Sequence, residues 1–178
     1  MESAEVRILS QHTPGVVVTF LRREASFGVP ATAGSSGHDL ISCEPRFWLR
    51  PRVISRIRTG VRLEIPRGYE GQVRSRSWHA SRGIVVANSP GTIDSDYRGE
   101  IIVLLQNVSE YHWEEVKPGD RIAQLVFAPV ALPSLTFQKF VDADKQPENL
   151  ERLVANEEPH EEVRIMERGD KGFGSTGK

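Results

Sequence analysis

The sequence predicts an all-β fold, either a sandwich or a jelly-roll-like barrel. Short runs of apolar and β-branched residues recur along the first 140 positions. Turn-forming residues separate these runs at close spacing, and hardly any stretch before residue 140 shows helical periodicity. Many short strands joined by tight turns are typical of all-β sandwiches and barrels.

The first strand is expected at 16–21, where Val-Val-Val-Thr-Phe-Leu follows the turn signal Thr13-Pro14-Gly15. A Gly/Ser-rich approach then leads into a short strand beginning at His38. Further short apolar runs follow, and turn residues at Pro51, Thr59-Gly60, 66–68 and 117–120 separate them. Residues 70–80 mix polar and aromatic types and show no such run. The predicted strands are 16–21, 38–42, 47–49, 53–57, 61–65, 84–87, 101–108, 113–116, 122–126 and 130–137.

The chain changes character after residue 140. Residues 142–166 are acidic and polar, and this composition favours a solvated linker or insertion. Leu150, Leu153 and Val154 are spaced as on one weak helix. The tail at 168–178 is glycine-rich around one aromatic residue and has no apolar run. We therefore divide the chain into an N-terminal extension (1–15), a β domain (16–140), an acidic insertion (141–167) and a flexible C-terminal arm (168–178).

Composition excludes several classes of protein. A net charge of −1 gives no basic surplus for nucleic acid. No run approaches the roughly 18 apolar residues of a membrane span. The first residues lack the features of a signal peptide, so an intracellular location (cytoplasm or nucleus) is expected. The single cysteine, Cys43, excludes an intramolecular disulfide and is expected to be a small buried residue.

The segment 88–100, Asn-Ser-Pro-Gly-Thr-Ile-Asp-Ser-Asp-Tyr-Arg-Gly-Glu, lies between the predicted strands 84–87 and 101–108. It is too polar for a core, and it carries two carboxylates, Asp94 and Asp96, with a tyrosine and an arginine. A loop held by strands on both sides is a common place for a functional site.

Three glycine-containing stretches, 71–82, 119–124 and 168–177, could bring backbone N–H groups close to an anion. Arginines add guanidinium groups suited to phosphate. No Gly-x-x-x-x-Gly-Lys-Ser/Thr sequence is present, so the protein is not a P-loop enzyme. With Phe173 between two glycines, these stretches favour a nucleotide that carries several phosphates. The arginines concerned are Arg74, Arg76, Arg82, Arg121 and Arg168.

Five blocks, in order and at suitable spacing, resemble the motifs of the homotrimeric dUTP pyrophosphatases (dUTPases). The third and fifth are the most specific, and the resemblance covers residues 16–140 and 167–178. The blocks are Gly37-His-Asp-Leu40, Arg76-Ser77 within 71–84, the segment 88–100, Gly119-Asp-Arg-Ile-Ala-Gln-Leu125 and the arm at 168–177.

The resemblance implies a reaction, hydrolysis of dUTP to dUMP and pyrophosphate. Asp94 matches the carboxylate that activates the water attacking the α-phosphate, although an aspartate alone could equally cap a turn. Tyr97 matches the ring beside the deoxyribose, with core packing as its structural alternative. Asp39 matches a carboxylate that orients other site residues without contacting the substrate itself. Uracil recognition is implied for Asn88, Gly91, Thr92 and Ile93.

The resemblance also implies how the phosphates are held. Arg76, Ser77, Gln124 and the backbone of Trp78 match phosphate contacts. Mg²⁺ is expected on the three phosphates and water, with no protein ligand. The arm is expected to come from a neighbouring subunit, so that a homotrimer shares its active sites. Its matching residues are Arg168, Phe173, Gly174, Ser175 and Thr176.

Four features depart from the family pattern. His38 stands where a tyrosine is usual, and Trp78-His79 replaces a small residue followed by leucine. Lys171 replaces a glycine, and 142–166 makes the connection to the arm unusually long.

Two alternatives remain open. One is a binding or signalling module on this fold with weak or lost catalysis. The other is deamination of dCTP, which is disfavoured because it typically needs a glutamate base where this chain has Ile93-Asp-Ser-Asp-Tyr97.

Overall fold

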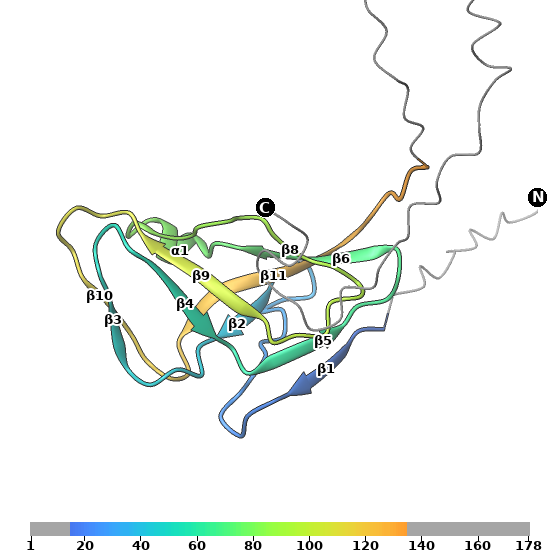
Figure 1. Ribbon diagram of the computed structural model, residues 1–178, viewed down its shortest axis with the longest axis horizontal. Helices are drawn as coiled ribbons and strands as arrows, with labels where there is room; N and C mark the ends of the chain where they lie inside the picture. The colour runs from blue at the N-terminus through green and yellow to red at the C-terminus, as the bar shows by residue number, and fades with distance from the viewer. Residues whose placement is uncertain (1–14, 135–178) are drawn as a thin grey trace, which may run out of the picture. The chain divides into compact units, whose positions relative to one another are not determined.

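The computed structural model describes residues 15–134, and the structural statements below concern that part of the chain. It contains eleven strands and one helical turn (Figure 1). In chain order these are β1 (Val17–Phe20), β2 (His38–Ile41), β3 (Phe47–Leu49), β4 (Ile54–Arg58), β5 (Val61–Glu64), β6 (Tyr69–Arg74), α1 (Ser77–Ala80), β7 (Ile84–Val86), β8 (Gly91–Ile93), β9 (Ile102–Asn107), β10 (Glu114–Val116) and β11 (Arg121–Pro129).

The strands pair only in antiparallel fashion within the described residues. A four-stranded sheet has the order β2-β11-β6-β8, and a three-stranded sheet has the order β4-β9-β7. Two further pairs, β1-β5 and β10-β3, complete the arrangement. The predicted all-β, jelly-roll-like class is therefore confirmed.

The core follows from the alternation of side chains along the strands. On β5, Val61 and Leu63 are buried, and on β9, Val103 and Leu105 are buried in the same way. Asn107 continues the β9 series inward and is fully buried. Its Nδ2 donates to the carbonyl oxygens of Leu49, at 3.1 Å, and His112, at 2.7 Å, so this polar side chain is satisfied.

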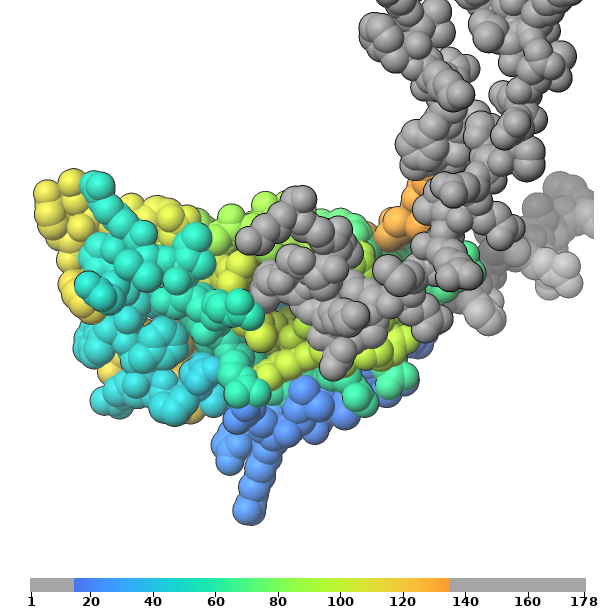
Figure 2. Space-filling model, viewed as in Figure 1, coloured from blue at the N-terminus to red at the C-terminus, as the bar shows by residue number. Residues whose placement is uncertain are grey.

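β3 and β10 lie at one end of the β domain, and their residues form the corresponding end of the surface (Figures 1 and 2). The exposed indoles of Trp48 and Trp113 belong to this end. The Arg50 guanidinium lies 5.8 Å from the centre of the Trp113 ring, which is within cation–π distance.

Several sequence expectations need correction. β6 and β8 fall in segments for which the sequence predicted no strand, and α1 lies where no helix was predicted. β11 continues through residue 129, whereas a separate strand was expected at 130–137; residues 130–134 form no strand, and 135–137 lie outside the described residues. Cys43 is half-buried rather than buried, and burial raises the pKa of its thiol. No helix of the described part is long and apolar enough to cross a membrane.

Candidate active site

One row of side chains crosses three strands of the four-stranded sheet. Gln124 on β11 is opposite Asp39 on β2 and also opposite Arg74 on β6. Directly opposed residues of neighbouring antiparallel strands project from the same face. Strand register therefore brings an amide, a carboxylate and a guanidinium from three distant segments into one row.

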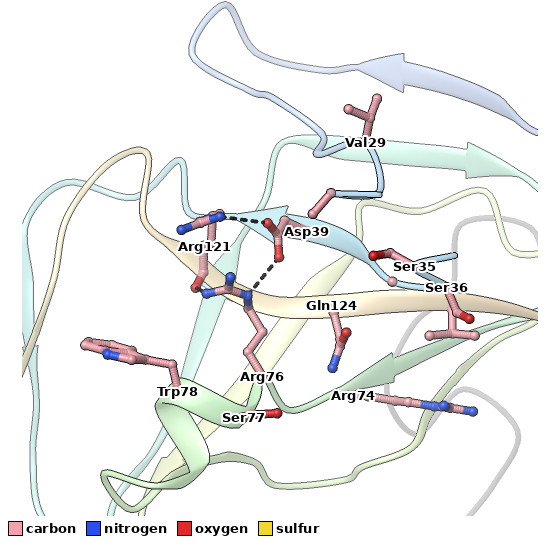
Figure 3. Close-up of a pocket in the computed structure, with 13 residues that line it drawn as sticks. Val29, Ser35, Ser36, Asp39, Arg74, Arg76, Ser77, Trp78, Arg121 and Gln124 are labelled. Carbon is pink, nitrogen blue, oxygen red and sulfur yellow. Dashed lines mark hydrogen bonds and ion pairs between the residues drawn. The ribbon is translucent and has the colours of Figure 1, made fainter. Parts of the chain in front are cut away.

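This row lines an open pocket of about 470 Å³ (Figure 3). Five predicted site residues line the pocket: Asp39, Arg76, Ser77, Trp78 and Gln124. Arg74 and Arg121, which the sequence offered only as arginines suited to phosphate, line it as well. The rest of the wall consists of Val29, Ala31, Ser35, Ser36, Gly37 and Val126.

The charge of the pocket is dominated by arginine. Asp39 Oδ1 lies 2.8 Å from Arg76 Nε, and its Oδ2 lies 3.4 Å from Arg121 Nη1. Arg76 also donates to the Arg121 carbonyl oxygen at 3.3 Å. Asp39 thus holds two guanidinium groups in place, and with Arg74 the pocket carries three arginines against one carboxylate. An excess of positive charge with several N–H donors suits a polyanionic ligand.

Gln124 is positioned by its neighbours on both sides. Its Nε2 donates to the Ser75 carbonyl oxygen at 2.9 Å. On the other side is Gly37, where an added Cβ would lie 2.3 Å from Gln124 Oε1. Gly37 therefore leaves the space in which the Gln124 amide sits.

The helical turn α1 begins directly after Arg76, whose backbone is extended at φ −87° and ψ 140°. This change of direction presents Ser77 and Trp78 at the pocket. The Trp78 indole is 58% exposed, and the Arg82 guanidinium lies 5.0 Å from its ring centre.

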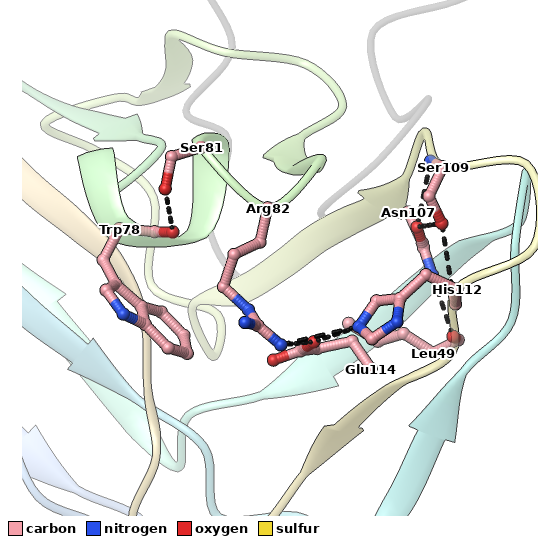
Figure 4. A network of polar contacts seen from close by, with 8 residues as sticks. All are labelled: Leu49, Trp78, Ser81, Arg82, Asn107, Ser109, His112 and Glu114. Carbon is pink, nitrogen blue, oxygen red and sulfur yellow. Dashed lines mark hydrogen bonds and ion pairs between the residues drawn. The ribbon is translucent and has the colours of Figure 1, made fainter.

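Arg82 is in turn anchored to the β10 end of the domain (Figure 4). Its Nη2 lies 2.8 Å from Glu114 Oε2, and His112 Nε2 lies 3.0 Å from the same oxygen. Burial would raise the pKa of Glu114, but hydrogen bonds from Arg82 and His112 outweigh it and leave that pKa below its ordinary value. Trp78 is thereby connected to a buried carboxylate through one arginine.

His79 and His38, two departures from the expected pattern, lie outside the pocket wall. His79 is buried, and desolvation, reinforced by Arg76, lowers its pKa. The His38 ring stacks on Phe27 at 5.3 Å and meets Phe127 edge-on at 5.6 Å, while its Nδ1 lies 3.1 Å from the Gly28 carbonyl oxygen. His38 thus packs as an aromatic residue, which accounts for a histidine where tyrosine was expected.

The segment 88–100 forms a second surface. β8 pairs with β6 through Gly91↔Val73, Thr92↔Gln72 and Gly71↔Ile93, at the sheet edge. The Asn88 side chain packs over Gly91, where an added Cβ would lie 3.0 Å from Asn88 Nδ2. These contacts fix the hairpin that carries Asn88, Gly91, Thr92 and Ile93.

Asp94 and Tyr97 follow β8 in a turn closed by a bond from the Tyr97 N–H to the Asp94 carbonyl oxygen, at 3.1 Å. Tyr97 Oη donates to the Glu100 carbonyl oxygen at 2.9 Å. The Glu100 carboxylate accepts bonds from the Gly60 N–H and the Arg58 guanidinium, each at 2.8 Å. The turn is therefore tied to the β4–β5 connection.

The structure does not bring all the predicted residues together. Among the described residues, none between 88 and 97 lines the pocket, and the β8 hairpin is separated from β11 by β6. Arg168, Phe173, Gly174, Ser175 and Thr176 lie outside the described residues. The roles assigned to these residues stay predictions.

The donor set bears on the expected Mg²⁺. Within residues 15–134 there is no group of three or more His, Cys, Asp or Glu side chains that could hold a metal ion. Both oxygens of Asp39, the carboxylate in the pocket, face guanidinium groups. The described pocket wall therefore offers an incoming Mg²⁺ no free carboxylate, and an ion that ligates phosphate oxygens and water could enter only together with a phosphate ligand.

Comparison with known proteins shows which family model and which relatives this chain matches. The dUTPase family model matches residues 23–177. The deoxyuridine 5'-triphosphate nucleotidohydrolase of Hydrogenobaculum sp. is 38% identical over 163 residues, covering 91% of this chain and 97% of the relative. The enzyme of the same name from Ehrlichia canis is 43% identical over 149 residues, covering 83% of this chain and 84% of the relative.

Solved structures of phage dUTPases share the fold. The dUTPase of Staphylococcus bacteriophage 80alpha, in a variant with dUpNHpp, matches with a TM-score of 0.63 at 27% identity, covering 93% of this chain and 100% of that one. A variant of the dUTPase from phage phi11 of S. aureus matches with a TM-score of 0.65 at 24% identity over 71% of this chain and 97% of that one. That structure is described as showing the coordination of a structural Mg(II) ion.

Proposed function

Because this chain belongs to the dUTPase family, we propose that it hydrolyses dUTP to dUMP and pyrophosphate, with Asp94 activating the attacking water. Its enzyme class, dUTP diphosphatase, follows from that membership. The observation that carries the proposal is the arginine-rich pocket in which family-motif positions from β2, from β11, and from α1 with the preceding Arg76 converge.

The reaction needs one proton acceptor and one polyanion site. Asp94 accepts a proton from water, the water oxygen bonds to the α-phosphorus, and the bond from that phosphorus to the bridging oxygen breaks. Pyrophosphate then leaves. Asp94 is half-buried in a turn tied to Tyr97, which supports a fixed position for the base.

The phosphates are assigned to the pocket. Arg76, Ser77 and Gln124 supply a guanidinium, a hydroxyl and an amide from its wall, and Trp78 supplies its backbone N–H. Asp39 acts behind them by holding Arg76 in place. Mg²⁺, when bound to the phosphates, neutralises part of their charge.

Uracil is assigned to the β8 hairpin. Asn88, Gly91, Thr92 and Ile93 present fixed backbone donors and acceptors beside a narrow turn, which suits discrimination of uracil from cytosine and thymine. We propose that the Tyr97 ring, which is partly buried against the core, packs with its remaining surface against the deoxyribose and rejects a ribose 2′-hydroxyl.

The separation of pocket and hairpin within one chain supports shared active sites. Neither surface alone provides a base-binding site, a phosphate site and a proton acceptor. We therefore infer a homotrimer in which neighbouring subunits complete each site, with the arm at 168–178 closing over the nucleotide. An intracellular location stays a prediction.

A nucleotide panel tests the proposal. The full-length protein with Mg²⁺ is incubated with dUTP, dCTP, dTTP and UTP, and pyrophosphate and ammonia are measured. We expect pyrophosphate from dUTP, almost none from the other three, and loss of activity with a chelator. Ammonia release from dCTP would indicate a deaminase instead. Failure of the assembled trimer to release pyrophosphate from dUTP would leave a binding module as the better description.

A further inference from the structure

We propose that Arg74 binds the polyphosphate part of the substrate, as a phosphate-binding residue in addition to the motif positions assigned above. The inference deepens the proposed function and rests on it. Arg74 was only one of several arginines suited to phosphate in the sequence; its position in the sheet distinguishes it from the others.

The first argument is register. Arg74 is directly opposite Gln124, and Gln124 is directly opposite Asp39, so the three side chains share one face of the sheet. Figure 3 shows Arg74 and Trp78 toward different ends of the pocket, with Arg76 and Gln124 between them. Arg74 therefore extends the row of predicted phosphate contacts by one more cationic group.

The second argument is charge. Arg76 and Arg121 both pair with Asp39, and Arg82 pairs with Glu114. Among residues 15–134, no carboxylate lies within ion-pair distance of Arg74; its guanidinium bonds to the neutral amide oxygen of Gln72. The Arg74 charge is thus the least compensated of the three arginine charges in the pocket. An exposed cation in this setting attracts phosphate oxygens most directly.

The third argument is preorganisation. Glu70, Gln72 and Arg74 alternate along β6 and project from the same face. Glu70 Oε1 accepts a bond from Gln72 Nε2 at 2.6 Å, which turns the Gln72 oxygen toward Arg74. Arg74 Nε donates to this oxygen at 3.2 Å, so the guanidinium is oriented without being neutralised. An oriented side chain loses less conformational freedom on binding.

Two separated cationic positions suit more than one phosphate. Arg76 is held near Asp39, and Arg74 projects from β6 two residues earlier in the chain. A pyrophosphate unit, which carries charge on two phosphorus centres, can use both arginines. We therefore assign Arg74 to the phosphates that leave as pyrophosphate.

The test compares Arg74→Gln, Arg74→Lys and a control, Arg67→Gln, in the full-length enzyme. Arg67 is an exposed arginine in the turn before β6 and does not line the pocket, so its replacement removes the same charge elsewhere. Steady-state kinetics with dUTP gives KM and kcat. Calorimetry with inorganic pyrophosphate gives binding to the free enzyme without turnover.

We expect Arg74→Gln to raise KM for dUTP by about tenfold and to weaken pyrophosphate binding by a similar factor, with kcat within about threefold of wild type. Arg74→Lys keeps the positive charge but loses the two-pronged guanidinium, so its KM and its pyrophosphate affinity should lie between those of wild type and Arg74→Gln. Arg67→Gln should change neither quantity by more than about twofold.

Equal KM and equal pyrophosphate affinity in Arg74→Gln and Arg67→Gln would overturn the assignment. If Arg74→Gln lowers kcat but leaves KM and pyrophosphate affinity unchanged, the assignment is also overturned. If the wild-type enzyme does not hydrolyse dUTP, the proposed function fails, whereas the pyrophosphate comparison still tests Arg74 independently.

Discussion

Replacing Gly37 by alanine would displace the Gln124 amide from the position that the pocket gives it. The new Cβ would lie 2.3 Å from Gln124 Oε1, and side-chain carbons essentially never approach an atom closer than 3.0 Å. The amide must therefore move by about 0.7 Å or more. Its 2.9 Å bond to the Ser75 carbonyl oxygen would be distorted as a result.

The expected cost falls on activity rather than on stability. A displacement of about 1 Å in a substrate-positioning group can cost roughly 100-fold in rate, so we expect kcat/KM for dUTP to fall about 10- to 100-fold. Losing one hydrogen bond costs about 0.5–1.5 kcal/mol. Restricting the unfolded chain by Gly→Ala offsets about 0.4–1 kcal/mol, so the melting temperature should change by only a few degrees.

Gly34→Ala provides a matched control in the same loop. Gly34 is exposed, and a Cβ there would meet no atom within 4 Å. Both variants are assayed by pyrophosphate release and by thermal unfolding. If Gly37→Ala retains the activity of Gly34→Ala, the placement of the Gln124 amide does not matter for turnover. If Gly37→Ala instead unfolds at a much lower temperature, its loss of activity reports folding, and the reasoning fails.

Three further predictions follow from the described residues and the arm. Asp94→Asn should bind dUTP within about threefold of wild type but lose at least about 100-fold in hydrolysis, and an unchanged rate would remove Asp94 as the base. Deleting 168–178 should abolish most turnover but leave the melting temperature nearly unchanged, because this segment has no apolar run; a large drop in melting temperature would contradict this. Burial lowers the pKa of His79 below its ordinary 6.5, so the unfolded chain binds the proton more readily and stability should fall as pH drops below 6.5. His79→Leu should reduce the difference between the free energies of unfolding measured by denaturant titration at pH 7 and at pH 5.5. An unchanged difference would mean that another group causes the pH dependence.

The strands that sequence predicted best are those with buried faces. Val61, Leu63, Val103 and Leu105 occupy alternate positions, and alternation is a local signal that survives without knowledge of the partner strand. β6 and β8 were missed because their outward residues are polar and their turns resemble loops. Glu70, Gln72 and Arg74 form one face of β6, and they are in a strand because β11 and β8 pair with it on both sides.

For the site, too, the sequence revealed individual residues but not the contacts that depend on which strands are neighbours. Sequence motifs selected Arg76, Ser77 and Gln124, and the structure brings these three into one pocket. The motifs could not show that Asp39 neutralises Arg76 and Arg121 while Arg74 keeps its charge, since this depends on which strands are neighbours. Likewise, His38 gave no sign in the sequence that it would pack between Phe27 and Phe127.

The sequence by itself determined the all-β class and the family, because side-chain alternation and motif residues are local features that can be recognised without knowing which strands are neighbours. Tertiary structure alone decided which charges meet. Side-chain pairing across β2, β11 and β6 depends on register, and register joins residues 39, 74 and 124 regardless of their distance along the chain. The separation of the pocket from the β8 hairpin was likewise decided by strand order, because β6 lies between β8 and β11.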